Sequence, residues 1–324
     1  MLTTPPAPAD PRRSAAPPPR PRSAALPRAA ADDRAADAAI VPLRDDHRAA
    51  AVDVALRTIW ADPDAPCGPA LQEDPLLDGV LARMSESDPD LNLVAVRDGR
   101  VVGLCAGVLR DGTWLMSQLA VAPDEHRSGV GARLAGAVIA AAAGRPEGPP
   151  RAAVLACSTD VRMLRGIVRA GLAVSPALHA VGPVDRRRLT REPTVRDADP
   201  ERDGELLEAL SRAARGASHR RDLPALVALG WRPVVDPRGA WGAAGPSGHP
   251  SFVVGTDEAA AGAVLRALLA DAPAEGTAVE GLRAGQDWAL RVVADLGLEL
   301  APSGAVATLG AVGSGPYLPS GLWL

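Results

Sequence analysis

One segment of the chain combines residue types that suit phosphate binding. It runs from Leu119 to Leu134 and reads LAVAPDEHRSGVGARL, so an apolar run is followed by Pro123 and then by Gly129 and Gly131. This pattern predicts a strand, a turn and an amphipathic helix in direct succession. The first N–H groups of a helix have no intrahelical partner, and the helix dipole favours an anion there. The segment therefore predicts an anion site built from backbone amides.

The glycines of this segment let a ligand approach the main chain closely. We expect the amides of residues 127–132 to point at the ligand, with Arg127 adding a positive charge beside them. Other phosphate-binding loops are excluded, because a Rossmann loop has a third glycine and a Walker A loop needs a Gly-Lys-Ser or Gly-Lys-Thr ending, whereas this chain contains no lysine. The residue types suit a pyrophosphate.

The neighbouring sequence predicts the elements that position this segment. Strand-like runs precede it, and the pairs Asp98-Gly99 and Asp111-Gly112 between them favour tight hairpins, so the sheet is expected to be antiparallel here. The predicted strands before the turn are Leu91–Val96, Val101–Leu109 and Thr113–Val121. After the helix we expect a strand, a further helix and two short strands, Leu172–Val174 and Leu178–Val181.

Residues 39–183 resemble the GNAT N-acetyltransferase superfamily. The phosphate loop of that family reads Gln/Arg-x-x-Gly-x-Gly/Ala after a strand that ends in Val-x-Pro. Here Val121-Ala122-Pro123 ends the strand, and residues 126–131 fill the loop with His126 in place of the usual Gln or Arg. The resemblance implies an α/β (α+β) fold with a mixed, mostly antiparallel sheet flanked by helices, and acetyl-CoA as co-substrate.

The resemblance also implies roles for individual residues. Backbone groups of Leu119 and Val121 would bind the pantetheine arm, where two strands diverge, and the loop amides would hold the pyrophosphate. An amine would attack the thioester directly, with a strand N–H stabilising the oxyanion. The residues assigned to acetyl-CoA in this way are Leu119, Val121, His126, Arg127, Ser128, Gly129, Val130, Gly131 and Ala132.

The acid–base groups common in that family have no counterpart at the matching positions. The strand that often carries a glutamate reads TWLMSQLAV, and Ile167 stands where a tyrosine is common. An attacking amine must lose a proton, so the site needs a base. We hypothesise that the C-terminal segment, which holds the chain's only tyrosine, docks toward the first cleft, and that Tyr317 or the terminal carboxylate of Leu324 serves there. The other interpretation is packing of this segment onto the second half of the chain.

Composition and a weak internal repeat predict a tail and two units. Residues 1–38 are rich in Pro, Ala and Arg and are expected to form a disordered tail. Residues 39–185 are expected to form the acetyl-CoA-binding domain, and residues 194–324 a degenerate GNAT-like domain with the docking C-terminal segment.

The proposed second copy lacks the residues of the phosphate loop. Aligning Val254 with Val121 places Ala260, Gly262 and Val264 where the first unit has Arg127, Gly129 and Gly131. A β-branched side chain in this turn would block the close approach of a ligand to the backbone. We therefore expect one acetyl-CoA site per chain.

Charge and composition exclude several classes of protein. The chain has 324 residues, a net charge of −4 and three cysteines without metal-ligand spacing. A slightly acidic chain lacks the basic surface that nucleic-acid binding needs, and no apolar run is long enough to cross a membrane. Widely spaced cysteines fit reduced thiols, so we expect a cytoplasmic protein.

The sequence thus predicts an acetyl-CoA-dependent N-acetyltransferase whose partners are acetyl-CoA and an amine acceptor, either a small molecule or a peptide. Because the usual acid–base groups are missing, a non-catalytic acyl-CoA-binding regulatory protein is the alternative. A partner-binding scaffold is a third class, motivated only by the Pro/Arg-rich tail.

Overall fold

The computed structural model describes residues 37–59, 74–146, 150, 152–155, 161–310 and 315–322. The predicted tail lies outside these ranges except for residues 37–38, and so do Cys67, Cys157, Trp323 and Leu324. Below, "first unit" means residues 39–185 and "second unit" means residues 194–324. Within the described ranges, no helix is both long and apolar enough to cross a membrane. No group of three or more described His, Cys, Asp or Glu residues could hold a metal ion.

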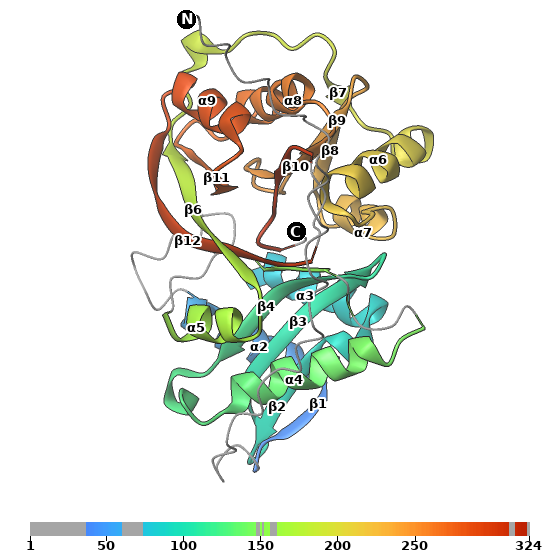
Figure 1. Ribbon diagram of the computed structural model, residues 1–324, viewed down its shortest axis with the longest axis vertical. Coiled ribbons are helices and arrows are strands. Elements are labelled where there is room, and N and C mark those ends of the chain that lie inside the picture. The colour runs from blue at the N-terminus through green and yellow to red at the C-terminus, as the bar shows by residue number, and fades with distance from the viewer. Residues whose placement is uncertain are drawn as a thin grey trace, which may run out of the picture.

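From β2 up to its last strand, the first unit has the predicted order of elements (Figure 1). Its elements are β1 (Ala39–Pro42), α2 (Asp45–Ile59), α3 (Asp74–Ser87), η2 (Pro89–Leu91), β2 (Leu93–Arg97), β3 (Arg100–Arg110), β4 (Thr113–Val121), η3 (Pro123–Glu125), α4 (Val130–Ala143), β5 (Ala152–Leu155), α5 (Val161–Arg169) and β6 (Ala173–Gly182). A short turn of helix, η4 (Arg186–Arg188), leads to the second unit.

The second unit contains β7 (Arg196–Asp197), α6 (Pro200–Arg215), α7 (Leu223–Ala228), β8 (Arg232–Asp236), β9 (Ala240–Ala244), β10 (Pro250–Gly255), α8 (Glu258–Ala270), β11 (Thr277–Leu282), α9 (Asp287–Asp295), β12 (Glu299–Leu309) and β13 (Tyr317–Leu318). From β10 onward it repeats the succession of strand, helix, strand, helix and strand that runs from β4 to β6 in the first unit.

Both predicted Asp-Gly hairpins are confirmed. The φ angles are 51° at Asp98 and 74° at Gly99 in the β2–β3 turn, and 50° at Asp111 and 75° at Gly112 in the β3–β4 turn. Positive φ at both central residues is typical of the turn whose twist matches that of the flanking strands. These turns keep β2, β3 and β4 in antiparallel register, which places β4 and the turn after it.

Strands of both units pair in one of the two sheets. The order of this eight-stranded sheet is β1-β2-β3-β4-β5-β12-β6-β11, and a five-stranded sheet, formed by the second unit alone, has the order β13-β10-β9-β8-β7. Strand β12 of the second unit lies between β5 and β6 of the first, and β6 lies between β12 and β11 of the second (Figure 1). The two units are therefore joined by the pairing of their last strands.

The two short strands expected at the end of the first unit are a single strand, β6. Between the two predicted strands lies Pro176, a residue that cannot donate a hydrogen bond to a sheet. In the structure Pro176 lies opposite Ala305, beside a register shift between Pro302 and Ala305 of β12. The irregular pairing at this point accommodates the proline, and the strand continues to Gly182.

Helices cover both faces of the first unit's sheet. Leu104, Ala106 and Ala120 pack with α2 and α3, whereas Cys105 packs with α4 on the opposite face. Burial raises the pKa of the Cys105 thiol to about 12, so this thiol stays protonated at neutral pH.

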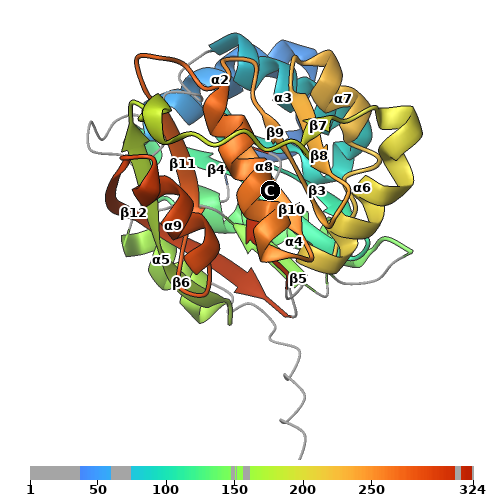
Figure 2. The same cartoon turned by 90° about the horizontal axis from the view of Figure 1, so that it is seen from above.

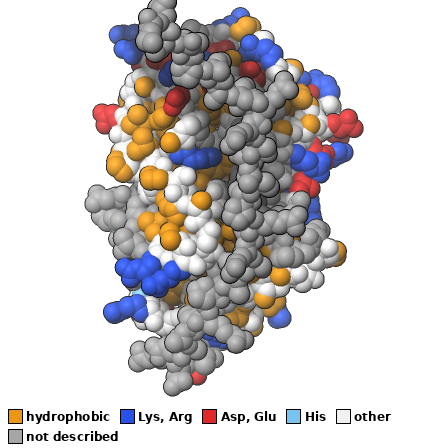
Figure 3. Space-filling view, in the orientation of Figure 1, with side chains coloured by type: hydrophobic (Ala, Val, Ile, Leu, Met, Phe, Trp, Pro, Cys, Tyr) orange, Lys and Arg blue, Asp and Glu red, His pale blue; other side chains and the backbone are white. Residues whose placement is uncertain are grey.

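A helix of each unit contacts the other unit. In Figure 2, α3 lies beside α7 of the second unit, and Gly79 of α3 leaves room for Leu229 at the end of α7. On the face seen in Figure 3, apolar side chains gather in patches with arginines between and beside them. Among the described residues, Val168 of α5 and Leu300 of β12 are exposed large apolar side chains.

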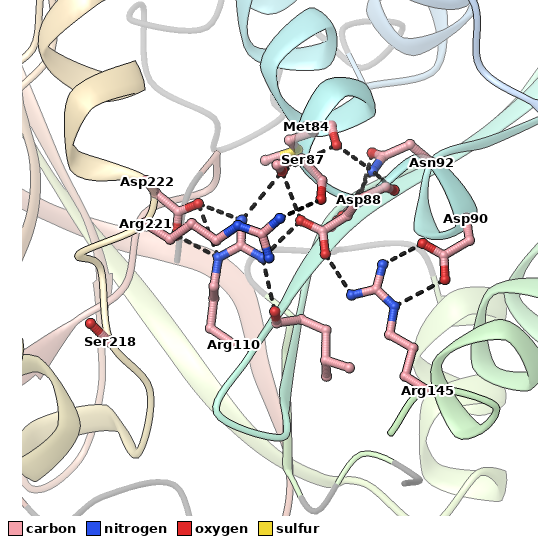
Figure 4. Close-up of polar contacts among 12 residues, drawn as sticks. Met84, Ser87, Asp88, Asp90, Asn92, Arg110, Arg145, Ser218, Arg221 and Asp222 are labelled. Atoms are coloured by element: carbon pink, nitrogen blue, oxygen red, sulfur yellow. Dashed lines mark hydrogen bonds and ion pairs between the residues drawn. The ribbon is translucent and has the colours of Figure 1, made fainter. Parts of the chain in front are cut away.

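A buried group of charges also joins the two units (Figure 4). Arg110, at the β3–β4 hairpin, is 5% exposed and donates from Nε to both carboxylate oxygens of Asp222 at 3.0 Å. Its Nη1 donates to Asp88 at 2.7 Å, and Asp88 also accepts from Arg145 at 2.6 Å. Asp222 precedes α7 in the second unit. The hairpin that positions β4 is therefore anchored on both units.

Candidate cofactor-binding site

The strand, turn and helix predicted for the phosphate-binding segment are confirmed. Strand β4 ends at Val121, and α4 begins at Val130 with Gly129 as its N-cap residue. The φ angles are 69° at Arg127 and 85° at Gly129, so the chain adopts the left-handed conformation twice in three residues. A non-glycine residue with such a φ is uncommon and marks a turn whose shape the surroundings impose.

The first turn of α4 presents free backbone donors. The N–H of Ser128 donates to the Glu125 carbonyl at 3.2 Å, and the first helical bond runs from the Arg133 N–H to the Gly129 carbonyl at 3.1 Å. The N–H groups of residues 129–132 precede that bond and lie at the positive end of the helix dipole. The side chain of Arg127 is exposed beside them. This geometry fits an anion such as a pyrophosphate.

Gly131 sets how close α4 comes to the strand. A Cβ at this position would lie 3.2 Å from a methyl group of Val121, which is tighter than normal contact. The glycine therefore lets the amide-bearing turn lie directly against the end of β4. Ser128 is buried, and its hydroxyl donates to the Glu125 carbonyl at 2.7 Å. The Ser128 side chain therefore stabilises the turn itself.

Two ion pairs that sequence analysis missed fix the turn to the neighbouring hairpin. Arg97 pairs with Glu125, and Arg100 pairs with Asp124 at 2.5 Å. Both arginines flank the Asp98-Gly99 turn, which was interpreted only as a hairpin signal. The positive charges of these arginines are complementary to the negative charges of the η3 turn. Once the β2–β3 hairpin was expected, this pairing of opposite charges could have been predicted from the sequence.

The main-chain groups of Leu119 and Val121 lie on the edge of β4 that faces away from β3. The Ala122 N–H donates to the Val102 carbonyl of β3 at 3.0 Å. Because hydrogen-bonding direction alternates along an antiparallel strand, the N–H and C=O of Leu119 and Val121 point away from β3. On that side the described pairing of β4 with β5 runs from Thr113 to Met116, and residues 156–160, which follow β5, lie outside the described residues. The role of these groups in binding pantetheine stays a prediction.

Two side chains already face the Val121 carbonyl. His126 Nε2 lies 2.9 Å from this oxygen. Thr58 Oγ1 of α2 lies 3.1 Å from it and 2.7 Å from the Val54 carbonyl, so its single proton is shared between the two oxygens. The imidazole thus folds back onto β4 instead of extending from the loop. Thr58 was missed by sequence analysis, because nothing in its local pattern separates it from other polar residues of α2. A pantetheine amide that donates to Val121 would compete with both side chains.

His126→Ala is therefore expected to tighten the binding of CoA. Removing the imidazole frees the Val121 carbonyl for a ligand amide, and one neutral hydrogen bond is worth about 0.5–1.5 kcal/mol, or roughly twofold to tenfold in Kd. Calorimetric titration of the variant with CoA measures this. Thr58→Val, which removes the other donor with little change in volume, is the matched variant. Weaker binding by His126→Ala would show that the ring contacts the ligand instead.

Gln118 is a further residue that sequence analysis did not single out. It is 4% exposed, and its Oε1 has no hydrogen-bond partner among the described residues, while its Nε2 donates weakly to Ser117 at 3.4 Å. The register of β3 and β4 shifts between Ala106 and Gly107, opposite Ser117. On the C-terminal side of this irregularity, the side chain of Gln118 lies on the same face of β4 as that of Ala120, which packs with α2. A buried, unpaired amide oxygen on this face is an available hydrogen-bond acceptor.

The structure places Tyr317 in the second unit. It pairs with Val254 in the β10–β13 ladder and is 2% exposed, and its hydroxyl has no partner among the described residues. Burial raises the pKa of Tyr317, against the opposing effect of the charges of Arg215 and Arg283. The C-terminal segment thus packs onto the second unit as far as it is described. The hypothesis that Tyr317 serves acid–base chemistry stays a prediction, and Leu324 lies outside the described residues.

The predicted alignment of the two units needs a correction at the loop. Strand β10 ends at Gly255 and α8 begins at Glu258, so only residues 256–257 connect them, whereas residues 122–129 connect β4 to α4. The residues aligned with the loop, namely Ala260, Gly262 and Val264, are therefore inside α8. The second unit differs from the first by the length of this connection and not by single substitutions.

Comparisons with known proteins bear on this fold. Residues 55–163 match the family model described as Acetyltransferase (GNAT) family. No curated protein sequence matches the chain significantly. Among solved structures, the chain is similar to a protein of Pyrococcus horikoshii assigned to the acetyltransferases, with 14% identity, a TM-score of 0.71, and coverage of 89% of this chain and 96% of that one.

Two further solved structures have a similar fold. A GCN5-related N-acetyltransferase from Sphaerobacter thermophilus shares 13% identity, with a TM-score of 0.56 and coverage of 90% of this chain and 98% of that one. A tandem GNAT protein from the clavulanic acid biosynthesis pathway shares 17% identity, with a TM-score of 0.53 and coverage of 85% and 98%. At these identities the similarity shows the fold, and it extends over both units.

Proposed function

We propose that the chain transfers an acetyl group from acetyl-CoA to an amine, because residues 55–163 match the model of the acetyltransferase (GNAT) family. The observation that carries this proposal is the first turn of α4, where the N–H groups of residues 129–132 precede the first helical bond. Amides in this position bind the phosphates of a nucleotide without needing a basic surface. The exposed Arg127 adds the one fixed positive charge of the predicted loop.

The edge of β4 that faces away from β3 supports the same proposal. Main-chain groups of Leu119 and Val121 point toward this edge, beside the turn that would hold the pyrophosphate. An extended chain with amide groups, such as pantetheine, can form hydrogen bonds there as an added strand would. When bound, acetyl-CoA supplies the acetyl thioester, and the Leu119 N–H, which points away from β3, would stabilise negative charge on its carbonyl oxygen.

We assign acceptor binding to the face of β4 that carries Gln118. Its unpaired Oε1 can accept a hydrogen bond from an amine and so hold the nitrogen beside β4. The side chains of β4 include no carboxylate, so the amine would pass its proton to a group outside this strand.

Gln118→Leu is expected to raise the KM for the amine by about tenfold, because one buried hydrogen bond is lost and its partner is left unpaired. Binding of CoA is expected to stay unchanged, since the main-chain groups of Leu119 and Val121 lie in the plane of the sheet, whereas the Gln118 side chain is directed out of that plane. Steady-state kinetics and CoA titration measure the two effects. Gln118→Glu keeps an acceptor oxygen and is expected to retain the KM within about threefold. An equal rise in KM for both variants would contradict the assignment.

The release of free thiol from acetyl-CoA with a panel of amines tests the proposed reaction, alongside CoA titration by calorimetry. Thiol release that depends on an amine supports acetyl transfer. The absent carboxylate on β4 favours one alternative, a regulatory protein that binds acyl-CoA without turnover. Binding without thiol release for any amine supports that alternative, and no binding contradicts both.

A further inference from the structure

The C-terminal segment, residues 315–322, forms an extra strand on β10 of the second unit. Val254 pairs with Tyr317 and Val253 pairs with Leu318, in antiparallel register. The Gly255 N–H donates to the Pro316 carbonyl at 2.9 Å. On its other edge β10 pairs with β9, so the segment satisfies an edge of β10 that would otherwise be open.

The same segment contacts β11 and the start of α9. A Cβ at Gly281 of β11 would lie 2.9 Å from the ring of Pro319, so the two main chains are in close contact. The side chain of Gln286, just before α9, donates to the Tyr317 carbonyl. The segment therefore lies between β10 and β11, as the ribbon also shows (Figure 1). Its residues Tyr317, Leu318 and Leu322 are all less than 5% exposed.

This position is the counterpart of the edge of β4 that faces away from β3. In the eight-stranded sheet β5 pairs with β12 and β11 pairs with β6, so β5 and β11 have equivalent neighbours. In the chain, β4 and α4 precede β5 just as β10 and α8 precede β11. The space between β10 and β11 thus corresponds to the one between β4 and β5, which the proposed function assigns to pantetheine. This equivalence rests on that proposed function.

The positive end of α8 is also occupied by the chain itself. The carboxylate of Asp257 accepts a hydrogen bond from the Ala260 N–H at 2.7 Å. A carboxylate at a helix N-terminus satisfies the free amides and the dipole that a phosphate would otherwise satisfy. The connection of residues 256–257 leaves no loop comparable to residues 122–129. Both halves of a potential cofactor site are therefore filled from within the chain.

We propose that the groove between β10 and β11 is a peptide-binding groove whose ligand is residues 315–322 of the same chain, in the place that acyl-CoA takes in the first unit. The peptide binds as an added strand, with its main chain on β10 and its apolar side chains buried. Gly315 is required at its start, because a Cβ there would lie 2.2 Å from the Gly255 carbonyl oxygen. The second unit consequently binds no acyl-CoA.

Gly315→Val in the full chain tests the groove. The new side chain collides with the backbone of Gly255 and displaces the segment, so we expect amide exchange at the Gly255 N–H to accelerate by at least about tenfold. Gly166→Val is the matched control, because a Cβ there meets no atom within 4 Å on the exposed side of α5. Equal protection of the Gly255 N–H in the wild type and in Gly315→Val would overturn the proposal.

A synthetic peptide of residues 315–322, GPYLPSGL, separates the possible ligands of the groove. Added to the Gly315→Val chain, it is expected to restore slow exchange at Gly255, whereas acetyl-CoA leaves this exchange unchanged. Protection by acetyl-CoA, or none by the peptide, would contradict the assignment. Because the readout is the Gly255 amide, the result does not depend on thiol release. Failure of the proposed acetyl transfer would therefore be seen separately, in the first unit.

Discussion

Arg110→Ala is expected to lower the free energy of unfolding by about 3–5 kcal/mol, because it leaves buried carboxylates without their partner. Asp88 and Asp222 are both less than 6% exposed, and the described ion pairs of Asp222 run only to Arg110. Asp88 keeps a hydrogen bond from Arg145. The lost interactions join the β3–β4 hairpin of the first unit to the start of α7 in the second unit, so both units are expected to lose stability together. Urea-induced unfolding measures the change.

Arg212→Ala is the matched control for this prediction. Arg212 also ties the β3–β4 hairpin to the second unit, donating to Asp111 at 3.0 Å, but its side chain is 52% exposed. Solvent screens such a pair, so the expected cost is below about 1 kcal/mol. A cost for Arg110→Ala no larger than that for Arg212→Ala would show that burial does not make the Arg110 pairs strong.

Acidification provides a second readout of the same network. Burial raises the pKa of the Asp88 carboxyl, but the charge of Arg110 and hydrogen bonds from Ser87, Arg145 and Arg110 outweigh it, so the pKa lies below its ordinary value. The stability that Asp88 contributes is thus present above its unfolded pKa of about 3.9 and is lost as the pH falls further. Without Arg110 the Asp88 carboxylate protonates more readily, because the charge that lowers its pKa is gone. The difference between wild type and Arg110→Ala is therefore expected to shrink below about pH 4.

The features that sequence predicted are local ones. Two Asp-Gly pairs imposed the hairpins around β3, since the turn conformation depends on those residues themselves. The turn before α4 was likewise predicted from its glycines. Gly129 adopts the left-handed conformation and Gly131 allows close contact with β4, and each requirement depends on that residue alone. This is why the candidate cofactor site could be found without a structure.

The features that sequence missed depend on residues far apart in the chain. Pairing of β6 with β12 joins residues such as Ala180 and Leu300, and nothing near Ala180 indicates a partner strand so distant. The contact of Arg110 with Asp222 spans 112 positions and looks locally like an ordinary charged hairpin. The apolar composition of the C-terminal segment predicted that it docks, but it did not indicate whether it docks on the first or the second unit. The segment pairs with the open edge of β10 in the second unit, and this edge exists only in the folded structure.

Gly129→Val is expected to weaken CoA binding by about 2–4 kcal/mol, between roughly thirtyfold and several-hundredfold in Kd. Gly129 has a φ of 85°, a left-handed conformation that a β-branched residue adopts only under strain. To relieve it, the turn must shift, and the amides of residues 129–132 lose their common direction. Each hydrogen bond to a charged phosphate is worth about 1.5–3 kcal/mol, so losing one or two of them accounts for the range. Calorimetric titration with CoA measures the effect.

Gly136→Val isolates the turn from the helix that carries it. Gly136 lies on the exposed side of the same helix, and a Cβ there meets nothing within 4 Å, so CoA binding should match the wild type. Arg127→Glu adds a variant that leaves the packing intact, because this side chain is exposed. Its weaker binding should depend on ionic strength, as expected for a screened charge near a phosphate, whereas the defect of Gly129→Val should persist at high salt. Full affinity in Gly129→Val at an unchanged melting temperature would mean that the ligand binds away from the α4 turn, and the proposed site would have to be abandoned.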